Sequence, residues 1–299
     1  MILAGRQYIL YRSKADEIII RVFGDGHFGA RGSRVDKWKR DIAEVEDDPR
    51  MYWLELGDWG DLINPRDRRF DPKHVDPDIP IAVYGEYGSY VREQVQGQYQ
   101  PVQEKGVGAA YGNHEWYYMN QTDQSNLHAA LCENLHIPNL SYCFMLDLVF
   151  IKVGNNAVPY NRVYHDERPV NDSHASWSVR VWGHHGMSGA RTPGGKVKNL
   201  IDAMHRWPSA DLVILGHGHS QVIAPPMISI DGDAACRKQV THTRLGAMTG
   251  SYLEAYPISD HPSYGERAGY EPNYLGPLDI HFKPWERVKW IPMVARDDR

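Results

Sequence analysis

Five short stretches of the chain each place Asp, His or Asn near a glycine. In chain order they are Gly24-Asp25-Gly26-His27, Gly57-Asp58-Trp59-Gly60-Asp61, Gly112-Asn113-His114-Glu115, His184-His185 and Gly216-His217-Gly218-His219. Carboxylate, amide and imidazole groups hold divalent transition metals at neutral pH. Six or more such groups around one point could hold two ions that share a carboxylate. The stretches therefore predict a hydrolytic metal site.

A strand-like apolar run precedes each stretch. The runs cover residues 17–23, 51–56, 107–111, 178–182 and 211–215, and each stops at a glycine. Residues 35–46 and 196–207 have the pattern of helices, and the second is amphipathic. Open α/β sheets bind ligands beyond the carboxyl ends of their strands. We therefore expect an α/β fold in which the strand ends bring the five stretches together.

The order and spelling of the stretches resemble the calcineurin-like metallophosphoesterases, whose pattern runs DxH, GDxxD, GNH(D/E), H, GHxH. The match spans residues 23–219, and GNHE and GHGH are its most specific parts. The resemblance implies a two-sheet sandwich flanked by helices, with four αββα layers. It also implies two divalent ions; manganese is expected, and iron, zinc or nickel tolerate the same ligands. The ligands of the first ion would be Asp25, His27, Asp58 and His219, and those of the second Asp58, Asn113, His184 and His217.

The fourth stretch leaves the choice of ligand open, because consecutive residues of a strand point to opposite faces. Aligning His184, His185 and Gly186 with the family's usual HHP motif favours His184. Aligning them with its HG variant favours His185. We assign the metal contact to His184 and a substrate contact to His185.

The residues also suggest direct hydrolysis. Asp58 is the natural bridging ligand, since one carboxylate has two oxygens. Two ions roughly 3.5–4 Å apart could generate a bridging hydroxide that attacks phosphorus, so no serine or cysteine nucleophile is needed. His114 is the candidate general acid, with Glu115 or another carboxylate orienting its imidazole. Asp61 could orient a ligand or contact this histidine.

Cations and aromatic residues near the stretches point to the substrate. Basic residues gather within 31–40, 66–69 and 191–198. From these segments and the aromatic residues we take Arg31, Arg191 and Trp116 as substrate contacts, although solvated helix faces and packing would also explain such residues. They favour a phosphodiesterase acting on DNA, RNA or nucleotides, with chemistry similar to the Mre11/SbcD nucleases. The alternatives are a phosphomonoesterase, including a protein phosphatase, and a metal-holding scaffold or partner-binding protein without turnover.

Length and composition indicate the domain organisation and the cellular location. The 299 residues are expected to form one domain, 1–299, with an insertion at about 62–106 that is a lid, a substrate wall or a surface excursion. No apolar run approaches the roughly 18 residues of a membrane span, so no membrane role is expected. Three scattered cysteines and no recognisable signal peptide favour a cytoplasmic protein. Segments such as HHGMSGARTPGGK resemble phage and bacterial members of the family, which favours a bacterial or phage-infected cytoplasm; no protein partner is indicated.

Overall fold

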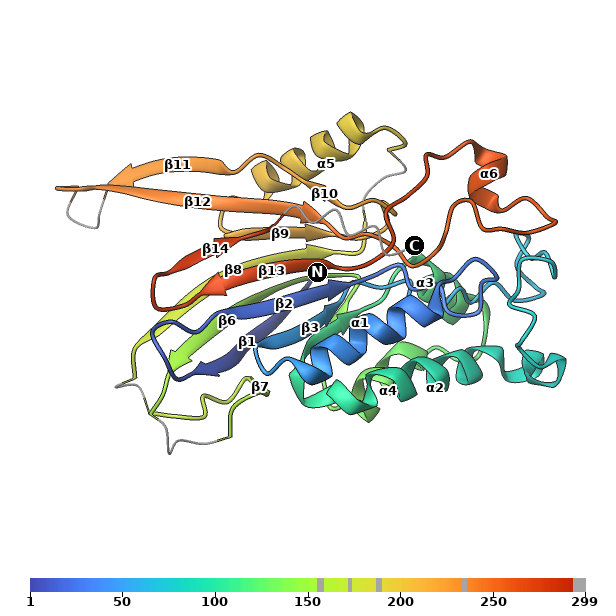
Figure 1. Ribbon diagram of the computed structural model, residues 1–299, viewed down its shortest axis with the longest axis horizontal. Coiled ribbons are helices and arrows are strands. Elements are labelled where there is room, and N and C mark those ends of the chain that lie inside the picture. The colour runs from blue at the N-terminus through green and yellow to red at the C-terminus, as the bar shows by residue number, and fades with distance from the viewer. Residues whose placement is uncertain (155–158, 172–173, 187–189, 233–235, 293–299) are drawn as a thin grey trace.

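The computed structural model describes residues 1–154, 159–171, 174–186, 190–232 and 236–292. Their strands form two sheets that pack face to face, with helices on both outer faces (Figure 1). The expected α/β sandwich with αββα layering is therefore confirmed.

The first sheet has the strand order β10-β12-β9-β8-β6-β1-β7, and β11 pairs with β12 beside it. Its strands are β1 (Ile2–Tyr11), β6 (Cys143–Lys152), β7 (Val163–His165), β8 (Ser176–His184), β9 (Leu212–Leu215), β10 (Val222–Ile223), β11 (Met227–Gly232) and β12 (Gln239–Met248). The second sheet has the order β14-β13-β2-β3-β4-β5. Its strands are β2 (Ile18–Phe23), β3 (Met51–Glu55), β4 (Gly106–Ala110), β5 (Asn139–Ser141), β13 (Leu278–Lys283) and β14 (Val288–Trp290).

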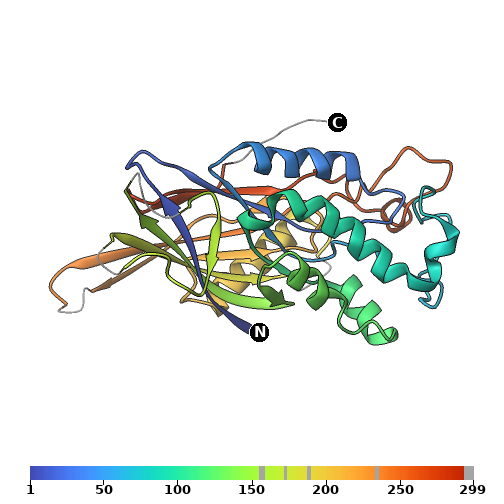
Figure 2. The ribbon, with the colours of Figure 1, turned by 90° about the horizontal axis from the view of Figure 1, so that it is seen from below.

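Helices cover both sheets. They are α1 (Val35–Asp47), α2 (Tyr87–Tyr99), α3 (Asn113–Gln121), α4 (Leu127–Asn134), α5 (Pro193–Arg206) and α6 (Tyr264–Ala268), with 3-10 turns η1 (Ile81–Glu86) and η2 (Gln100–Lys105). Figure 2 shows α1, α2 and α4 covering one face, and in Figure 1 α5 lies on the opposite side of the molecule. Among the described residues, no helix combines the length and apolar character needed to cross a bilayer.

Among the described residues, the three largest apolar clusters hold these layers together. The central one lies between the sheets and joins residues such as Val22 of β2 to Val181 of β8. A second packs Trp38 of α1 and Val91 of α2 against the second sheet. The third packs α5 against the first sheet, where Trp182 of β8 is one of its members. Strands β2, β3, β4 and β9 are thus buried on both faces, as their apolar runs predict, whereas β11 and the first part of β12 are largely exposed.

The five predicted runs are strands in the structure, namely β2, β3, β4, β8 and β9. Strands β2, β3 and β4 are parallel neighbours, as are β8, β9 and β12, so the carboxyl ends within each group lie at the same edge. The sequence pattern does not predict β1 or β6, because neither strand leads into a metal-ligand stretch.

The insertion at 62–106 is built in two parts. Its C-terminal part contains α2, whose Val91, Val95 and Tyr99 are buried in the second cluster, so this part belongs to the core rather than to a surface excursion. The preceding loop contacts the segment after β2, where Ala30 forms a β-bridge with Val75.

Candidate metal centre

The backbone turns sharply where the strands deliver the candidate ligand residues. Five of these residues have a positive φ, a conformation that non-glycine residues rarely adopt. They are Asp25 (52°), His27 (47°), Asp58 (52°), His217 (62°) and His219 (46°). Such strained residues cluster at functional sites, where the surrounding structure holds them in place. Here the turns bring the side chains from two sheets to one place.

Two glycines allow the loops after β3 and β4 to come together. Gly57 has φ 99°, and a Cβ there would lie 2.4 Å from the backbone nitrogen of Gly112. A Cβ on Gly112 would lie 2.2 Å from Asp58 Oδ1 and 2.6 Å from His185 Cε1. Both contacts are far inside van der Waals distance, so larger residues would force the loops and the ligands apart.

Asp25, His27 and His219 form a first donor group. Asp25 Oδ1 lies 3.2 Å from His219 Nε2 and 3.9 Å from His27 Nε2. Asp25 Oδ2 accepts the backbone N–H of His217 at 2.8 Å, which links the carboxylate to the loop after β9. Asp25 and His27 are almost completely buried, with exposed fractions of 0% and 2%, so the group lies within the protein rather than on its surface.

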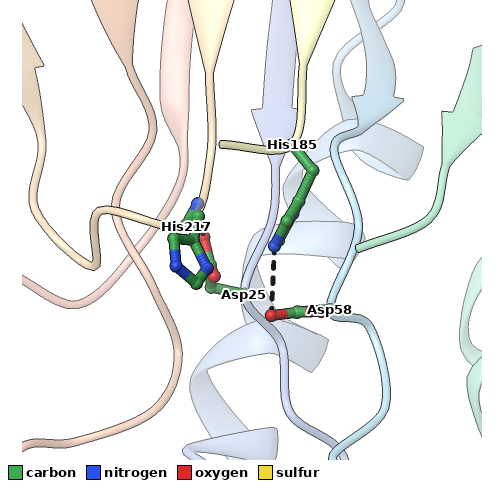
Figure 3. A group of neighbouring side chains, drawn as sticks. All are labelled: Asp25, Asp58, His185 and His217. Atoms are coloured by element: carbon green, nitrogen blue, oxygen red, sulfur yellow. Dashed lines mark hydrogen bonds and ion pairs between the residues drawn. The ribbon is translucent and has the colours of Figure 1, made fainter. Parts of the chain in front are cut away.

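A second donor group joins Asp58, Asn113, His185 and His217. Figure 3 shows three of these side chains together with Asp25, and its dashed line joins His185 Nε2 to Asp58 Oδ2 at 3.1 Å. Asn113 Oδ1 lies 3.2 Å from His185 Nε2, and the same amide position lies 2.9 Å from His217 Nδ1 and 3.3 Å from Asp58 Oδ2. Turned by half a rotation, the amide would instead donate N–H groups to these three atoms.

The imidazole rings have second partners that leave one nitrogen facing the cluster. His185 Nδ1 contacts the Leu56 carbonyl at 2.9 Å, and His27 Nδ1 contacts Asp61 Oδ1 at 3.3 Å. Ser251 Oγ lies 3.4 Å from His219 Nδ1 and donates to the Asp25 carbonyl at 3.0 Å. A histidine that donates its other N–H in this way presents an unprotonated nitrogen to a metal. In all three residues that nitrogen is Nε2.

The donor set fits divalent transition metals. Asp25 Oδ1 and His27 Nε2 are buried and have no hydrogen-bond partner. Buried polar atoms ordinarily have a partner, and a cation would supply one here. Mixed carboxylate, amide and imidazole ligands suit ions such as zinc, manganese, iron and nickel. The described residues can therefore hold metal, with both donor groups facing inward.

Charges within the cluster shift the pKa values of its members. Burial alone would raise the pKa of Asp58, but His185 and His114 outweigh it and lower this pKa well below its ordinary value. Burial alone would lower the pKa of His185, but Asp58 raises it to about 10. Without metal, a proton on His185 Nε2 thus holds this pair together. Metal and proton compete for that nitrogen, so metal binding at neutral pH releases a proton.

The two histidines of the pair lie in different surroundings, and His185 rather than His184 joins the donor groups. His185, expected as a substrate contact, is 0% exposed and points into the cluster. His184, expected as the ligand, stacks on Trp182 with ring centroids 5.6 Å apart, and its Nδ1 accepts the N–H of Gly186 at 2.9 Å. Side chains alternate along a strand, so His184 shares the α5 face with Trp182, whereas Val181 and His185 face the other sheet.

Of the carboxylates considered for orienting His114, Glu115 contacts backbone groups. The buried Glu115 carboxylate accepts the backbone N–H groups of Asp58 at 2.9 Å, Gly60 at 3.0 Å and Gly112 at 2.7 Å. Burial, followed by the nearby Asp58 charge, raises its pKa to about 8. Asp61 instead lies beside both imidazoles: its carbonyl contacts His114 Nδ1, and its Oδ1 lies 3.3 Å from His27 Nδ1. Glu115 therefore shapes the loops, and Asp61 orients the rings.

The expected substrate contacts lie outside the donor groups. Arg31 pairs with Asp260 at 3.5 Å, and the guanidinium of Arg191 lies 5.5 Å from the Tyr270 ring centre. Within the described residues, neither arginine forms a hydrogen bond or ion pair with a cluster residue. Trp116 is 44% exposed on α3, close in sequence to Asn113.

Some supporting residues were not predicted from the sequence. Ser251 contacts both Asp25 and His219, and it lies three residues after the end of β12, as Asp58 lies three residues after the end of β3. This placement after β12 is a signal that could have identified it. The Leu56 carbonyl that orients His185 carries no such signal, because any residue provides a carbonyl.

Comparison of the sequence with protein-family models found no match, and comparison with curated proteins found none. Among solved structures, a single mutant of Vps29 from Entamoeba histolytica shares 12% identity, with 88% of this chain and 85% of that chain covered and a TM-score of 0.33. A Streptococcus pneumoniae TIGR4 protein described as a predicted phosphoesterase shares 10%, with 93% and 99% covered and a TM-score of 0.30. Wild-type Entamoeba histolytica Vps29 complexed with zinc shares 11%, with 92% and 97% covered and a TM-score of 0.32. These similarities are too remote to carry an argument about function.

Proposed function

We propose that the protein is a dinuclear-metal-dependent phosphoester hydrolase and that it acts on phosphodiesters of nucleic acids or nucleotides. The observation that carries this proposal is the position of Asp58 Oδ2. This oxygen lies 3.1 Å from His185 Nε2 and 4.0 Å from His27 Nε2, so it faces a donor of each group. Asp58 Oδ1 is occupied by the backbone N–H of His114 at 2.8 Å. Asp58 is therefore positioned to be shared between two ions.

The ligand sets follow from the two donor groups. Asp25, His27, Asp58 and His219 would hold one ion, and Asp58, Asn113, His185 and His217 the other. When bound, two such ions supply Lewis acidity and activate water at neutral pH. The chain supplies the orientation, because hydrogen bonds to Leu56, Asp61 and Ser251 fix the three imidazoles before any substrate arrives.

His114 is placed to transfer a proton. Its Nδ1 is engaged by the carbonyl of Asp61, which leaves Nε2 to hold the proton that a leaving oxygen requires. The side chain is 11% exposed, so it lies at the boundary between the buried cluster and solvent. Its ring packs edge-on against His27 with centroids 4.6 Å apart, next to the donor groups.

The surface beside His114 favours a diester substrate. Trp116 and Tyr117 follow directly on α3, are 44% and 45% exposed, and have ring centroids 5.0 Å apart. Exposed aromatic rings near a catalytic centre are suited to stacking on nucleobases.

The test compares hydrolysis of bis-p-nitrophenyl phosphate and p-nitrophenyl phosphate by protein loaded with Mn²⁺, followed by single-stranded DNA. We expect the diester to be preferred. A clear preference for the monoester would replace the diester proposal with the phosphatase alternative. Absence of turnover on any phosphoester, with metal bound, would favour the scaffold alternative.

Two variants test the assigned roles. Asp58→Asn should lower metal occupancy and reduce hydrolysis by at least about 10²-fold, because the shared carboxylate loses its charge. Asp202→Asn, which changes an exposed carboxylate on α5, is the control. His114→Gln should keep its metal and slow turnover by roughly 10²- to 10⁴-fold. Full activity of Asp58→Asn would refute the shared ligand, and loss of metal in His114→Gln would make His114 a ligand.

A further inference from the structure

The loop that follows the second stretch is folded by its own polar side chains. The buried Asn64 accepts the N–H of Arg66 through Oδ1 at 2.8 Å, and its carbonyl accepts the N–H of Asp67 at 2.9 Å. Asp67 repeats the arrangement, since its Oδ1 accepts the N–H of Arg69 at 2.8 Å. Asx turns of this kind fix a loop without regular secondary structure. The backbone of Arg69 is therefore held in a defined position.

The Arg69 side chain is also held in place. Its Nε and Nη2 donate to the two carboxylate oxygens of Asp67 at 3.1 and 2.8 Å, a bidentate pair. The guanidinium carbon lies 5.6 Å from the ring centre of Tyr117. The side chain of Asp67 is 7% exposed, whereas that of Arg69 is 38% exposed. The pair is therefore anchored at the carboxylate and open to solvent at the cation.

This cation lies on the side of α3 that carries the candidate catalytic residues. Tyr117 is one helical turn after Asn113 and His114, so its contact places Arg69 beside that turn. The pKa of Arg69 is raised chiefly by its hydrogen bonds to Asp67, with further contributions from the charges of Asp61 and Asp58. The guanidinium is therefore within electrostatic reach of the metal-ligand carboxylates. Its Nη1 makes no hydrogen bond to an acceptor in the described part of the chain.

We propose that Arg69 is a substrate-binding residue that contacts a nonbridging phosphate oxygen of the substrate through its outer N–H groups, while Asp67 positions it. This inference rests on the proposed function, because the substrate must be a phosphoester. An oriented guanidinium suits phosphate better than a mobile ammonium, since it presents several N–H groups in fixed directions. The contact is made to ground state and transition state alike, so it acts on KM rather than on kcat.

The experiment uses Arg69→Ala with the neighbouring Arg68→Ala as the matched control, because both remove one exposed cation from the same loop. We expect Arg69→Ala to raise KM for bis-p-nitrophenyl phosphate by about 10- to 100-fold, the usual worth of a charged hydrogen bond, with kcat changed by less than about threefold. Arg68→Ala should resemble wild type. Arg69→Lys keeps the charge but not the planar guanidinium, so its KM should lie between those of Arg69→Ala and wild type. It also replaces Arg69→Ala in the test if that variant does not fold.

Orthophosphate provides a readout that does not require turnover. Calorimetry of the Mn²⁺-loaded proteins should show weaker phosphate binding in Arg69→Ala but not in Arg68→Ala, with equal metal content by elemental analysis. Equal KM and equal phosphate affinity in the two alanine variants would overturn the assignment of Arg69. If wild type does not hydrolyse phosphoesters, the proposed function fails, and the phosphate titration still decides whether Arg69 is an anion contact.

Discussion

Glu115 Oε2 accepts the backbone N–H of Asp58 at 2.9 Å and thereby ties α3 to the loop that carries the central carboxylate of the candidate metal site. The other carboxylate oxygen accepts the N–H of Gly60 at 3.0 Å. One fully buried side chain thus holds together the two loops that supply Asp58 and Asn113.

Replacing Glu115 should therefore affect stability and metal affinity together. Glu115→Ala leaves three buried N–H groups without their acceptor. We expect it to lower the free energy of unfolding by about 3 kcal/mol, since each such group costs about 1–3 kcal/mol and these losses are not additive. Urea unfolding measures this change. Glu115→Gln keeps an acceptor, so its free energy of unfolding should fall by less. Equal stability of Glu115→Ala and wild type would contradict the bridging role of Glu115.

The histidine pair offers a direct comparison of neighbouring residues. Loss of a residue that only supports a metal ligand typically weakens metal binding by roughly 10- to 100-fold. His185→Ala should weaken Mn²⁺ or Zn²⁺ binding by more than this, because it removes a proposed ligand. His184→Ala should keep metal affinity and lose only packing against Trp182. Titration calorimetry on both variants separates the two roles. The reverse pattern would restore His184 as the ligand.

A methyl group at Gly112 should disturb the centre without removing a ligand. In Gly112→Ala the new Cβ would lie 2.2 Å from Asp58 Oδ1, so the carboxylate must move. We expect weaker metal binding and reduced stability. Gly97→Ala is the control, because a Cβ at this position on α2 meets no atom within 4 Å. It should raise stability by about 0.5–1 kcal/mol, the usual gain for replacing a helical glycine. Metal affinity equal to wild type in Gly112→Ala would show that the loops adapt.

Glu55 should make stability depend on pH. Its Oε2 accepts the hydroxyl of Tyr99 at 2.6 Å, its Oε1 accepts the N–H of Gly57 at 3.1 Å, and burial raises its pKa from 4.5 to about 8. A carboxyl group with a raised pKa in the folded state stabilises the fold below its unfolded pKa. That contribution is lost as the pH rises through about 8.

The measurement is the free energy of unfolding of wild type and Glu55→Gln from pH 4 to pH 9. Glu55 should lower the free energy of unfolding of wild type by a few kcal/mol as the pH rises across this range, and we expect the variant to lack this decline. Glu133→Gln, at an exposed position on α4, should follow the wild-type curve. Parallel curves for wild type and Glu55→Gln would show that Glu55 is ionised in the folded protein at neutral pH.

Much of the fold was predictable because its signals are local. Each of the five apolar runs ends at a glycine, and all five are strands whose carboxyl ends carry candidate ligands. The helices at 35–46 and 196–207 were predicted nearly in full as α1 and α5. The strands β1 and β6 pair in parallel through residues far apart in the chain, and no local pattern indicated that pairing.

The sequence by itself determined the types of donor atom and the strand ends on which they lie, because residue identity and hydrophobic periodicity are local properties. Only the tertiary structure decided that His185 rather than His184 faces Asp58, since this depends on which face of β8 packs against the other sheet. The same holds for the choice between Glu115 and another carboxylate as the partner of His114: a carboxylate acts on whatever group the packing of distant loops brings within hydrogen-bond distance, and that distance is not encoded in residue spacing.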